Sequence, residues 1–452
     1  EELTTDPSDV PTQYVDDIDH NNSASDGSLY DIDESEYDDD HSLRKHLQVW
    51  SNKYNITNVA INKLLSILKP FHPELPNDSR SLKKTPRKTR VIVLSNGEYS
   101  HVDLRYGIMS KLKYGIQNCD KILVDVFVDG VKVHRNVSEE CWPILARCKD
   151  FVDSKPFVVG IFHGLGKPKP IKDYLSNFVQ EVKELRQEGI ILQTRHFDVD
   201  IRYYLGDARA YLKCIKGSTS LDGCERCDQE GGYDGFVYYS ITTGIERTDE
   251  SFDSRRDPEH HTGESPLIEL QVKFISQFPM DSFHLIEIGI MKRFLEFVIA
   301  RGPVIARMNG QEIETLSTLL SNLADYIPVE FSRKPSLRRF SQWKGTEFRL
   351  MMLYLGVVVL KFVLREEVYK LYLLFHAAMY ILYNDTLIET HLTDASNFID
   401  MFVQYSAKVF GKGFVVYNVH MLLHLISDVK RFGNVMNFSA NSYSKSSKRC
   451  YV

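Results

Sequence analysis

Two pairs of metal-binding side chains, 193 positions apart (Cys227 to His420), constrain the fold of this chain most strongly. Cys224 and Cys227 form a Cys-x-x-Cys pair, and His420 and His424 lie four positions apart in "YNVHMLLHL". Histidines four apart leave one face of a helix about one turn apart. Two thiolates and two imidazoles complete a tetrahedral ligand set for Zn²⁺. The pattern predicts a structural zinc ion that ties the middle of the chain to its C-terminal part.

Two plainer interpretations stay open at this point. The thiols can be incidental residues of a surface turn, and a histidine on an apolar helix is commonly a hydrogen-bonded core residue. Other metal and redox chemistries fit less well. A nucleobase deaminase needs His-x-Glu shortly before the thiols, whereas the only His-x-Glu here is at 72–74. No clear strand-to-helix entry of the thioredoxin kind precedes Cys224.

The N-terminal 42 residues differ sharply in charge from the rest of the chain. They hold about fifteen Asp and Glu and no Lys or Arg, and they are poor in large apolar side chains, which predicts disorder. The net charge of −6 therefore hides a net positive remainder. A positive remainder is compatible with a nucleic-acid partner. At 452 residues, two or three domains are expected.

Residues 43–90 predict a helical module followed by a basic linker. Apolar residues recur at helical spacing in two stripes, with Asn55 or Thr57 as the cap between them. Two short helices suit either a DNA-binding helix-turn-helix or a plain helical hairpin. The linker that follows is expected to be a solvated connection or an arm that contacts phosphates. Its candidate nucleic-acid-binding residues are Lys83, Lys84, Arg87, Lys88 and Arg90.

Residues 91–265 predict an α/β domain with a mixed sheet. Alternating residues indicate a strand from Lys121 to Val128, and Asp129-Gly130 indicates a hairpin turn. Further strands are expected at 90–94 and 157–164, an amphipathic helix at 171–188, and a strand, turn and helix within 190–215. Strands that alternate with helices in this way are typical of the α/β class.

Residues 266–452 predict a large helical region. The expected helices span 281–300, 310–325, 346–363, 366–385, 391–409 and 417–429. The longest uncharged apolar run, Leu350–Leu360, is much shorter than the roughly 20 residues needed to cross a bilayer, so no membrane partner is expected. Seven cysteines without a dense framework favour a reducing, intracellular compartment.

Two aspartates are candidates for metal-dependent catalysis. Asp129 follows one predicted strand and Asp207 follows another, 78 positions later. Carboxylates from neighbouring strands can hold two divalent ions about 3.5–4 Å apart for phosphoryl transfer, and Mg²⁺ prefers such oxygen ligands. Asp125 lies on the same strand face as Asp129 and is an alternative ligand. An aspartate beside a glycine is also ordinary turn chemistry.

Six ordered blocks of the sequence resemble the CACTA-type DNA transposases, in the lineage distantly similar to the catalytic subunit of the V(D)J recombinase. The resemblance runs from about residue 43 almost to the end of the chain. The blocks are "LPNDSRSLKKTPR", "VFVDGVKVHRNVSEECWPIL", "GDARAYLKCIKGSTSLDGCERC", "PMDSFHLIEIGIMKR", "WKGTEFRLMMLYLG" and "YNVHMLLHLISDVKRFG".

The resemblance implies an RNase H-like core with a large helical region and a catalytic triad of two aspartates and one glutamate. Asp129 takes the position of the first acid and Asp207 that of the second, with Mg²⁺ or Mn²⁺ as the catalytic ion. Cys224, Cys227, His420 and His424 take the zinc positions, and His284 in "MDSFH" matches a family histidine. The implied partner is double-stranded DNA at transposon ends, in the nucleus, with homo-oligomerisation left open.

The third acid is where the sequence departs from the family. The family places a glutamate about twenty residues after the histidine pair, and Ser444 stands at that position here. A hydroxyl cannot supply the charge of a carboxylate ligand to Mg²⁺. Glu347 in "WKGTEFR" is the substitute candidate for the third acid. Two functions therefore remain: a transposase-like enzyme of DNA cleavage and strand transfer, and a domesticated, catalytically dead DNA-binding or scaffolding protein.

Overall fold

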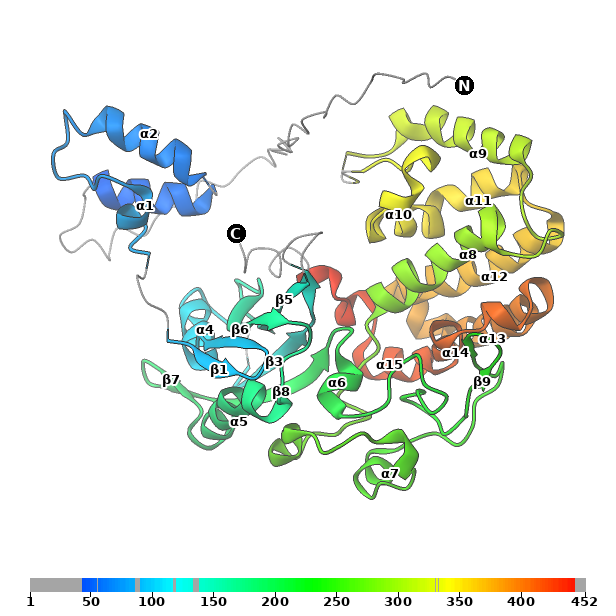
Figure 1. The fold of residues 1–452 in the computed structure, drawn as a ribbon, viewed down its shortest axis with the longest axis horizontal. Coiled ribbons are helices and arrows are strands. Elements are labelled where there is room, and N and C mark those ends of the chain that lie inside the picture. The colour runs from blue at the N-terminus through cyan, green and yellow to red at the C-terminus, as the bar shows by residue number, and fades with distance from the viewer. Residues whose placement is uncertain are drawn as a thin grey trace, which may run out of the picture. The chain divides into compact units, whose positions relative to one another are not determined.

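A computed structural model describes residues 43–54, 56–85, 90–116, 119–132, 138–329, 331 and 333–443 (Figure 1). The chain divides into two compact units, Glu1–Lys88 and Thr89–Val452. The sheet and the C-terminal helices thus belong to one unit, whereas the N-terminal helices belong to the other.

The N-terminal unit is built from the two predicted helices and one additional turn of helix. α1 spans Leu43–Lys53, α2 spans Asn58–Leu68 and α3 spans Ser79–Leu82. The side chain of Thr57 accepts a hydrogen bond from the backbone N–H of Ala60, which confirms Thr57 as the cap. Four buried residues form the small core of this unit: Ile61, Leu65, Leu75 and Leu82.

The larger unit contains the predicted mixed sheet. Its strands are β1 (Ile92–Leu94), β2 (Gly97–His101), β3 (Lys121–Val128), β4 (Val131–Lys132), β5 (Glu139–Cys148), β6 (Phe157–Leu165), β7 (Ile190–Leu192) and β8 (Arg195–Leu205). The strand order is β1-β2-β6-β5-β3-β8-β7, with β4 beside β5. Only β3 and β8 pair in parallel within this described sheet. Helix α5 (Ile171–Glu188), which was predicted, lies between β6 and β8 in the chain, and α4 (Leu104–Leu112) precedes β3.

The predicted hairpin turn at Asp129-Gly130 is wrong. β4 pairs with β5 rather than with β3, and Val131 opposes Cys141 in the same register in which Val128 opposes Ile144. The chain therefore runs straight along β5 through Asp129 and Gly130. The Asp129 carboxylate accepts the Gly130 N–H, and a side chain at position 130 would collide with the ring of Trp142. Glycine serves here to let that ring pack, not to make a turn.

The two faces of β3 contact different parts of the molecule. Ile122, Val124 and Val126 point into a core shared with α4 and α5. Phe127 on the other face belongs to the core of the C-terminal helical region. The predicted alternation along β3 is confirmed, and its second face carries the acids of interest.

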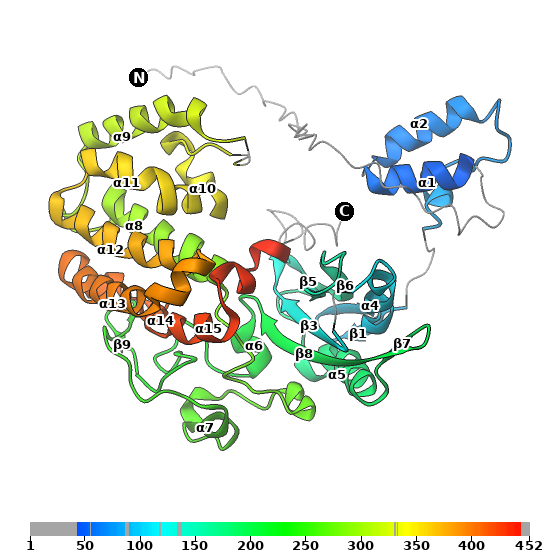
Figure 2. The same ribbon diagram turned by 180° about the vertical axis from the view of Figure 1, so that it is seen from behind.

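The helical region reproduces the predicted segments with small shifts (Figure 2). The α-helices are α6 (Arg209–Lys213), α7 (Asp249–Asp253), α8 (Lys292–Glu296), α9 (Gly310–Leu323), α10 (Gly345–Leu350), α11 (Gly356–Val359), α12 (Glu366–Leu382), α13 (Asp385–Phe410), α14 (Tyr417–Met421) and α15 (Leu425–Phe432). Three π-helical segments, Phe283–Met291, Phe297–Arg301 and Met351–Leu355, extend α8 and α10. Seven 3₁₀ turns lie at Pro258–His260, Pro266–Leu270, Ala324–Tyr326, Leu337–Gln342, Leu360–Phe362, Lys412–Phe414 and Leu422–His424, and an eighth at Val435–Phe438. A two-stranded ribbon joins β9 (Gly232–Tyr233) to β10 (Val237–Tyr238).

None of the helices in the described part of the chain has the length and apolar character needed to cross a bilayer.

Candidate functional site

The predicted thiol and imidazole pairs meet in one buried cluster. Cys224 Sγ lies 3.5 Å from Cys227 Sγ and 3.8 Å from His424 Nε2, and Cys227 Sγ lies 3.4 Å from His420 Nε2. All four ligand atoms lie within 4.8 Å of one another. Separations of 3.4, 3.5 and 3.8 Å are close to those expected between ligand atoms that surround one ion with Zn–S bonds of about 2.3 Å and Zn–N bonds of about 2.0 Å. The cluster can hold a metal such as zinc.

The surroundings of the cluster favour metal binding. His420 Nδ1 lies 3.0 Å from the carbonyl oxygen of Ser240, a partner that leaves Nε2 free for a metal. The neighbouring Cys224 and the two histidines lower the pKa of the Cys227 thiol, whereas burial raises the pKa of Cys224. A bound cation would favour the thiolate form of both cysteines.

The two residues between the thiols attach the cluster to both of its neighbours. Glu225 accepts hydrogen bonds from Lys213 at 2.8 Å and from Arg209 at 3.2 Å, both on α6. Arg226 lies 2.9 Å from Asp428 on α15. All five residues are buried, and removing one partner of such a pair costs about 3–5 kcal/mol. The thiol segment is therefore held against α6, which directly follows Asp207, and against α15.

Asp129 and Asp207 emerge side by side from the parallel strand pair. Phe127 on β3 lies opposite Leu205 on β8, and each acid follows two positions after its paired residue. Gly206 has a φ of +125°, and a Cβ there would collide with the carbonyl oxygen at the end of β3. The glycine thus allows the two strand ends to approach closely. The structure brings the two predicted acids to one edge of the sheet.

A pocket of about 270 Å³ lies at this edge. Asp207, Asp281 and His284 line it, together with Met421. The Met421 sulfur lies 3.8 Å from Cys224 Sγ, so the pocket and the Cys₂His₂ cluster share a wall. Asp129 Oδ2 lies 4.0 Å from His284 Nε2.

His284 is held between two carboxylates. Its Nδ1 lies 2.6 Å from Oδ2 of Asp281, a fully buried side chain whose other oxygen accepts the backbone N–H groups of Phe283 and Ala440. Burial alone would lower the pKa of His284, but Asp281 and then Asp129 outweigh it and raise the pKa to about 9. Near neutral pH an imidazolium therefore faces the acids.

The carboxyl of Asp129 is unusually easy to protonate. Burial raises its pKa to about 7, and the charges of Asp207 and Asp281 act in the same direction against the opposing effect of His284. The Asp207 side chain is more open, since this residue is exposed to solvent. A cation placed between the acids would offset the repulsion between them.

Asp125, the alternative ligand, is engaged elsewhere. Its carboxylate is fully buried and lies 3.0 Å from Arg147 and 2.6 Å from Arg202. It also accepts a hydrogen bond of 3.0 Å from the Tyr203 hydroxyl. Two arginines neutralise this carboxylate, so the geometry favours Asp129 as the ligand.

The two candidate positions for the third acid are Ser444 and Glu347. Ser444 lies outside the described residues. Tyr443, directly before it, stacks on Phe127 with ring centroids 4.7 Å apart. Glu347 is buried at the start of α10, where it accepts the Lys344 N–H and lies 3.0 Å from Arg333. It is not among the residues that line the acid pocket.

The predicted basic residues are only partly described. Arg87 and Lys88 lie outside the described residues. Lys84 and Arg90 are exposed, whereas the Lys83 ammonium group donates to Asn58 within the N-terminal unit at 3.4 Å. Lys84 and Arg90 thus retain the exposure that contact with phosphates requires.

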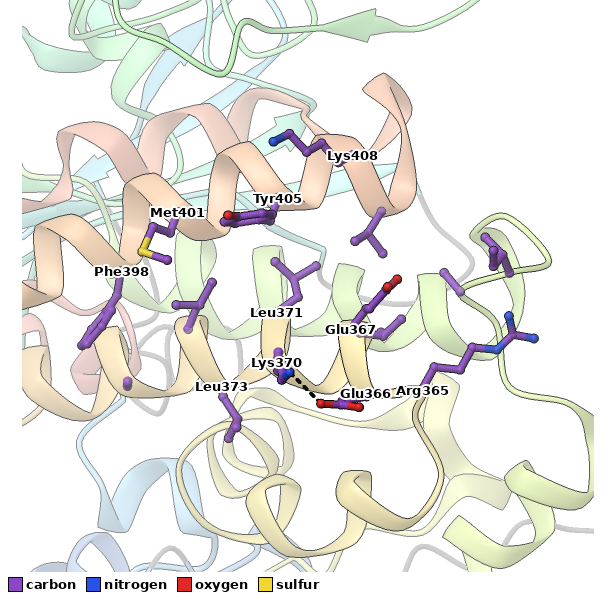
Figure 3. A pocket seen from close by; sticks show the side chains of 16 residues that line it. Arg365, Glu366, Glu367, Lys370, Leu371, Leu373, Phe398, Met401, Tyr405 and Lys408 are labelled. Atoms are coloured by element: carbon purple, nitrogen blue, oxygen red, sulfur yellow. Dashed lines mark ion pairs between the residues drawn. The ribbon is translucent and has the colours of Figure 1, made fainter.

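A much larger groove, of about 1170 Å³, lies along α12 and α13 (Figure 3). Leu371, Phe398 and Met401 give it an apolar surface, and Lys370 pairs with Glu366 at 2.6 Å on its rim. None of the predicted site residues lines this groove. Its size therefore does not make it the site of the chemistry.

Three side chains at the site were not predicted from the sequence: Asp281, Glu225 and Arg226. Asp281, three positions before His284 in "MDSFH", was not recognised as the histidine's partner. The ion pairs of Glu225 and of Arg226 join residues distant in sequence, so nothing local indicates them. The spacing Asp-x-x-His was the one available signal, because it is a helical i, i+3 contact.

Compared with known proteins, the chain matches no family model and no curated protein.

Proposed function

We propose that this chain is a transposase-like protein of the DDE class, whose ancestral reaction is the metal-dependent cleavage and transfer of DNA strands. The observation that carries the proposal is the parallel pair β3 and β8, whose adjacent ends are followed by Asp129 and Asp207. A mixed sheet with α5 between its parallel neighbours supports an RNase H-like core. Such a protein acts on double-stranded DNA in the nucleus.

Asp129 and Asp207 are the residues that would hold catalytic Mg²⁺ or Mn²⁺. Their oxygen ligands suit these hard cations. Paired divalent ions, when bound, activate the attacking oxygen and stabilise the leaving oxygen of an in-line phosphoryl transfer. Among the described residues, only the Cys₂His₂ cluster forms a ready group of three or more ligands. The third carboxylate near the two acids, Asp281, is engaged by His284 and by the backbone N–H groups of Phe283 and Ala440.

The remaining side chains of the pocket position and balance these acids. Asp281 orients His284 through its 2.6 Å contact, which keeps Nε2 directed at Asp129. The positive charge of His284 offsets the repulsion between the acids before substrate arrives. The Cys₂His₂ cluster, in the proposed zinc-bound state, fixes the wall formed by Met421.

A second function is favoured by the residue at position 444. With serine in place of the family's glutamate, the sequence lacks one of the anionic ligands that the resemblance implies. The protein would then keep the fold and DNA binding and lose strand cleavage. This is the domesticated DNA-binding or scaffolding protein.

Nicking of supercoiled plasmid DNA in the presence of Mn²⁺ tests the proposal. Nicking by the intact chain should be lost in Asp207→Asn and retained in Asp198→Asn. Asp198 is a matched control because it lies on β8, the strand that Asp207 follows, with its side chain 77% exposed.

A Ser444→Glu variant separates the two functions. If the intact chain is inactive and Ser444→Glu nicks DNA through Asp207, the chain is a catalytically dead member of the DDE class. If neither protein nicks DNA, or if nicking survives Asp207→Asn, the assignment of these acids is incorrect.

A further inference from the structure

A second polar pocket, of about 550 Å³, is lined by residues of α5, β8 and α15 and contains neither of the two acids. Arg186, Lys273 and Arg431 line it, and Asp200 is its only acidic lining residue. The lining thus carries three positive charges and one negative charge. None of these residues has a part in the acid pocket or in the Cys₂His₂ cluster.

The single acid of this pocket is already neutralised. Asp200 lies 2.8 Å from Arg186 and 3.1 Å from Lys121. Arg186 also donates to the carbonyl oxygen of Leu270. These contacts fix Arg186 in the wall and leave Asp200 little capacity to attract another cation.

Lys273 and Arg431 remain available. Over the described ranges, neither side chain makes a hydrogen bond or an ion pair. The charge of Arg431 acts on the carboxylate of Asp249, which is already engaged by hydrogen bonds from the backbone N–H groups of Ile275 and Ser276 and from the Ser276 hydroxyl. Lys273 interacts with the charge of Glu250. Glu250 is exposed to solvent, so water and ions screen this interaction.

We infer that this pocket binds a phosphate group of the DNA backbone, with Lys273 and Arg431 as its contacts. An ammonium and a guanidinium group with no protein partner form an anion site, and guanidinium matches phosphate geometry well. The neutral donor Gln277 is unavailable, because its amide donates to Ile201 and its oxygen accepts from Lys273 N–H. Recognition is therefore by charge, which suits a backbone and not a base sequence.

The position of the pocket along β8 suits a duplex that also reaches the acids. Asp200 precedes Asp207 by seven residues, which spans roughly 23 Å of extended strand. That length corresponds to about seven base pairs of duplex DNA at 3.4 Å per step. The identity of the polymer rests on the proposed function, whereas the anion site rests on the pocket itself.

Salt-dependent DNA binding by the intact chain tests this inference. Labelled duplex DNA is titrated at several salt concentrations without divalent ions, and the slope of log K against log salt is compared between variants. The pocket variant is Lys273→Gln with Arg431→Gln. The control is Lys361→Gln with Arg365→Gln, an exposed Lys and Arg pair outside this pocket with the same change in charge.

Each neutralised phosphate contributes about 0.9 to the slope, so the pocket variant, which loses one phosphate site, should lose about 0.9 while the control keeps the slope of the intact chain. An unchanged slope in the pocket variant, or equal losses in both variants, would overturn the inference and leave the proposed function standing. Absence of any DNA binding by the intact chain would instead remove the proposed function, together with the choice of DNA as ligand.

Discussion

The pKa of the Asp129 carboxyl group depends strongly on the surroundings of this side chain. Its partly buried position, beside two further carboxylates and an imidazolium, places its pKa near the pH of the cell. Asp207 is exposed and shares the same strand edge. A cation bound between the two carboxylates would favour their ionised forms.

Metal binding at the acids should strengthen with pH. Since the pKa of Asp129 is about 7 and that of His284 about 9, raising the pH from 6 to 8 ionises Asp129 while His284 stays positive. The ionised fraction of Asp129 grows about tenfold over this range. Calorimetric titration with Mn²⁺ should show about tenfold tighter binding at pH 8 than at pH 6.

The stability of the metal-free protein should change in the opposite direction. Between the ordinary pKa of aspartate, 3.8, and about 7, folded Asp129 keeps a proton that the unfolded chain releases. Its contribution to stability is therefore lost as the pH rises through 7. Asp129→Asn should abolish both dependences, and equal Mn²⁺ affinity of the intact chain at pH 6 and pH 8 would contradict this assignment.

At the scale of elements, the approach of two strand ends determines where the acids lie. Gly206→Ala should separate β8 from β3, because alanine is strained at a φ of +125° and its Cβ would meet the end of β3. We expect a loss of about 1–3 kcal/mol in the free energy of unfolding, together with loss of strand cleavage in any active form. Urea unfolding measures the first effect.

Gly217→Ala is the matched control for that substitution. Position 217 has no heavy atom within 4 Å of a new Cβ and no positive φ. Its unfolding free energy should stay within about 0.5 kcal/mol of the original value. If Gly206→Ala is equally neutral, the close approach of the strand ends is not required.

A contact between α5 and the start of α4 should make the stability of the fold sensitive to acid. Glu181 on α5 accepts the imidazole N–H of His101 at 2.9 Å and the backbone N–H groups of Leu104 and Arg105 at the start of α4. Burial would raise its pKa, but the hydrogen bonds with His101 and Asp103, together with those from the two backbone N–H groups, outweigh burial and lower it to about 2. Its stabilisation is present above pH 4.5 and is lost as the pH falls towards 2.

Glu181→Gln should therefore remove part of the acid sensitivity. The variant should lose about 1–3 kcal/mol at pH 7, where a charged acceptor is replaced by a neutral one, and less at pH 3. Urea unfolding at the two pH values provides the comparison. An equal loss at both would show that the charge of Glu181 contributes nothing.

Periodic elements could be predicted from the sequence, whereas some interrupted strands could not. The alternation from Ile122 to Val128 and the helical spacing in α12 each have a local cause, burial of one face. β5, at the centre of the strand order, was not predicted because Pro143 interrupts its pattern and a proline has no N–H for the ladder. Asp129-Gly130 has the composition of a turn, yet the ring of Trp142 requires the glycine for packing.

The candidate site likewise contains some residues that could be predicted from the sequence and others that could not. The four cluster ligands were predictable, since metal coordination restricts residue type and spacing. The pairs of Glu225 with α6 and of Arg226 with α15 were not, because a buried ion pair leaves no periodic trace in the sequence. Asp281 had a local signal in its spacing from His284.

At the scale of the whole molecule, one cluster connects the sheet edge with the C-terminal helices. Cys224 and Cys227 follow the strand that carries Asp207, and His420 and His424 belong to the last helices. The acid pocket lies between these parts and shares Met421 with the cluster. A metal ion there would therefore stabilise the larger unit and the geometry of its acids together.

Removal of the metal should loosen this connection selectively. Cys224→Ser should lose the ion and lower the thermal stability of the larger unit, whereas Cys148→Ser, a buried cysteine outside the cluster, should retain the ion. The helices α1 and α2 belong to the other compact unit, so their unfolding should be unaffected. Metal analysis combined with thermal unfolding followed by circular dichroism distinguishes the variants.

X-ray absorption at the zinc edge of the purified intact chain tests directly whether two cysteines and two histidines bind one zinc ion. The account predicts one zinc ion per chain, bound by two sulfur atoms at about 2.3 Å and two nitrogen atoms at about 2.0 Å. A chain that purifies without stoichiometric zinc and does not take it up, or whose zinc has a different set of ligand atoms, would contradict it.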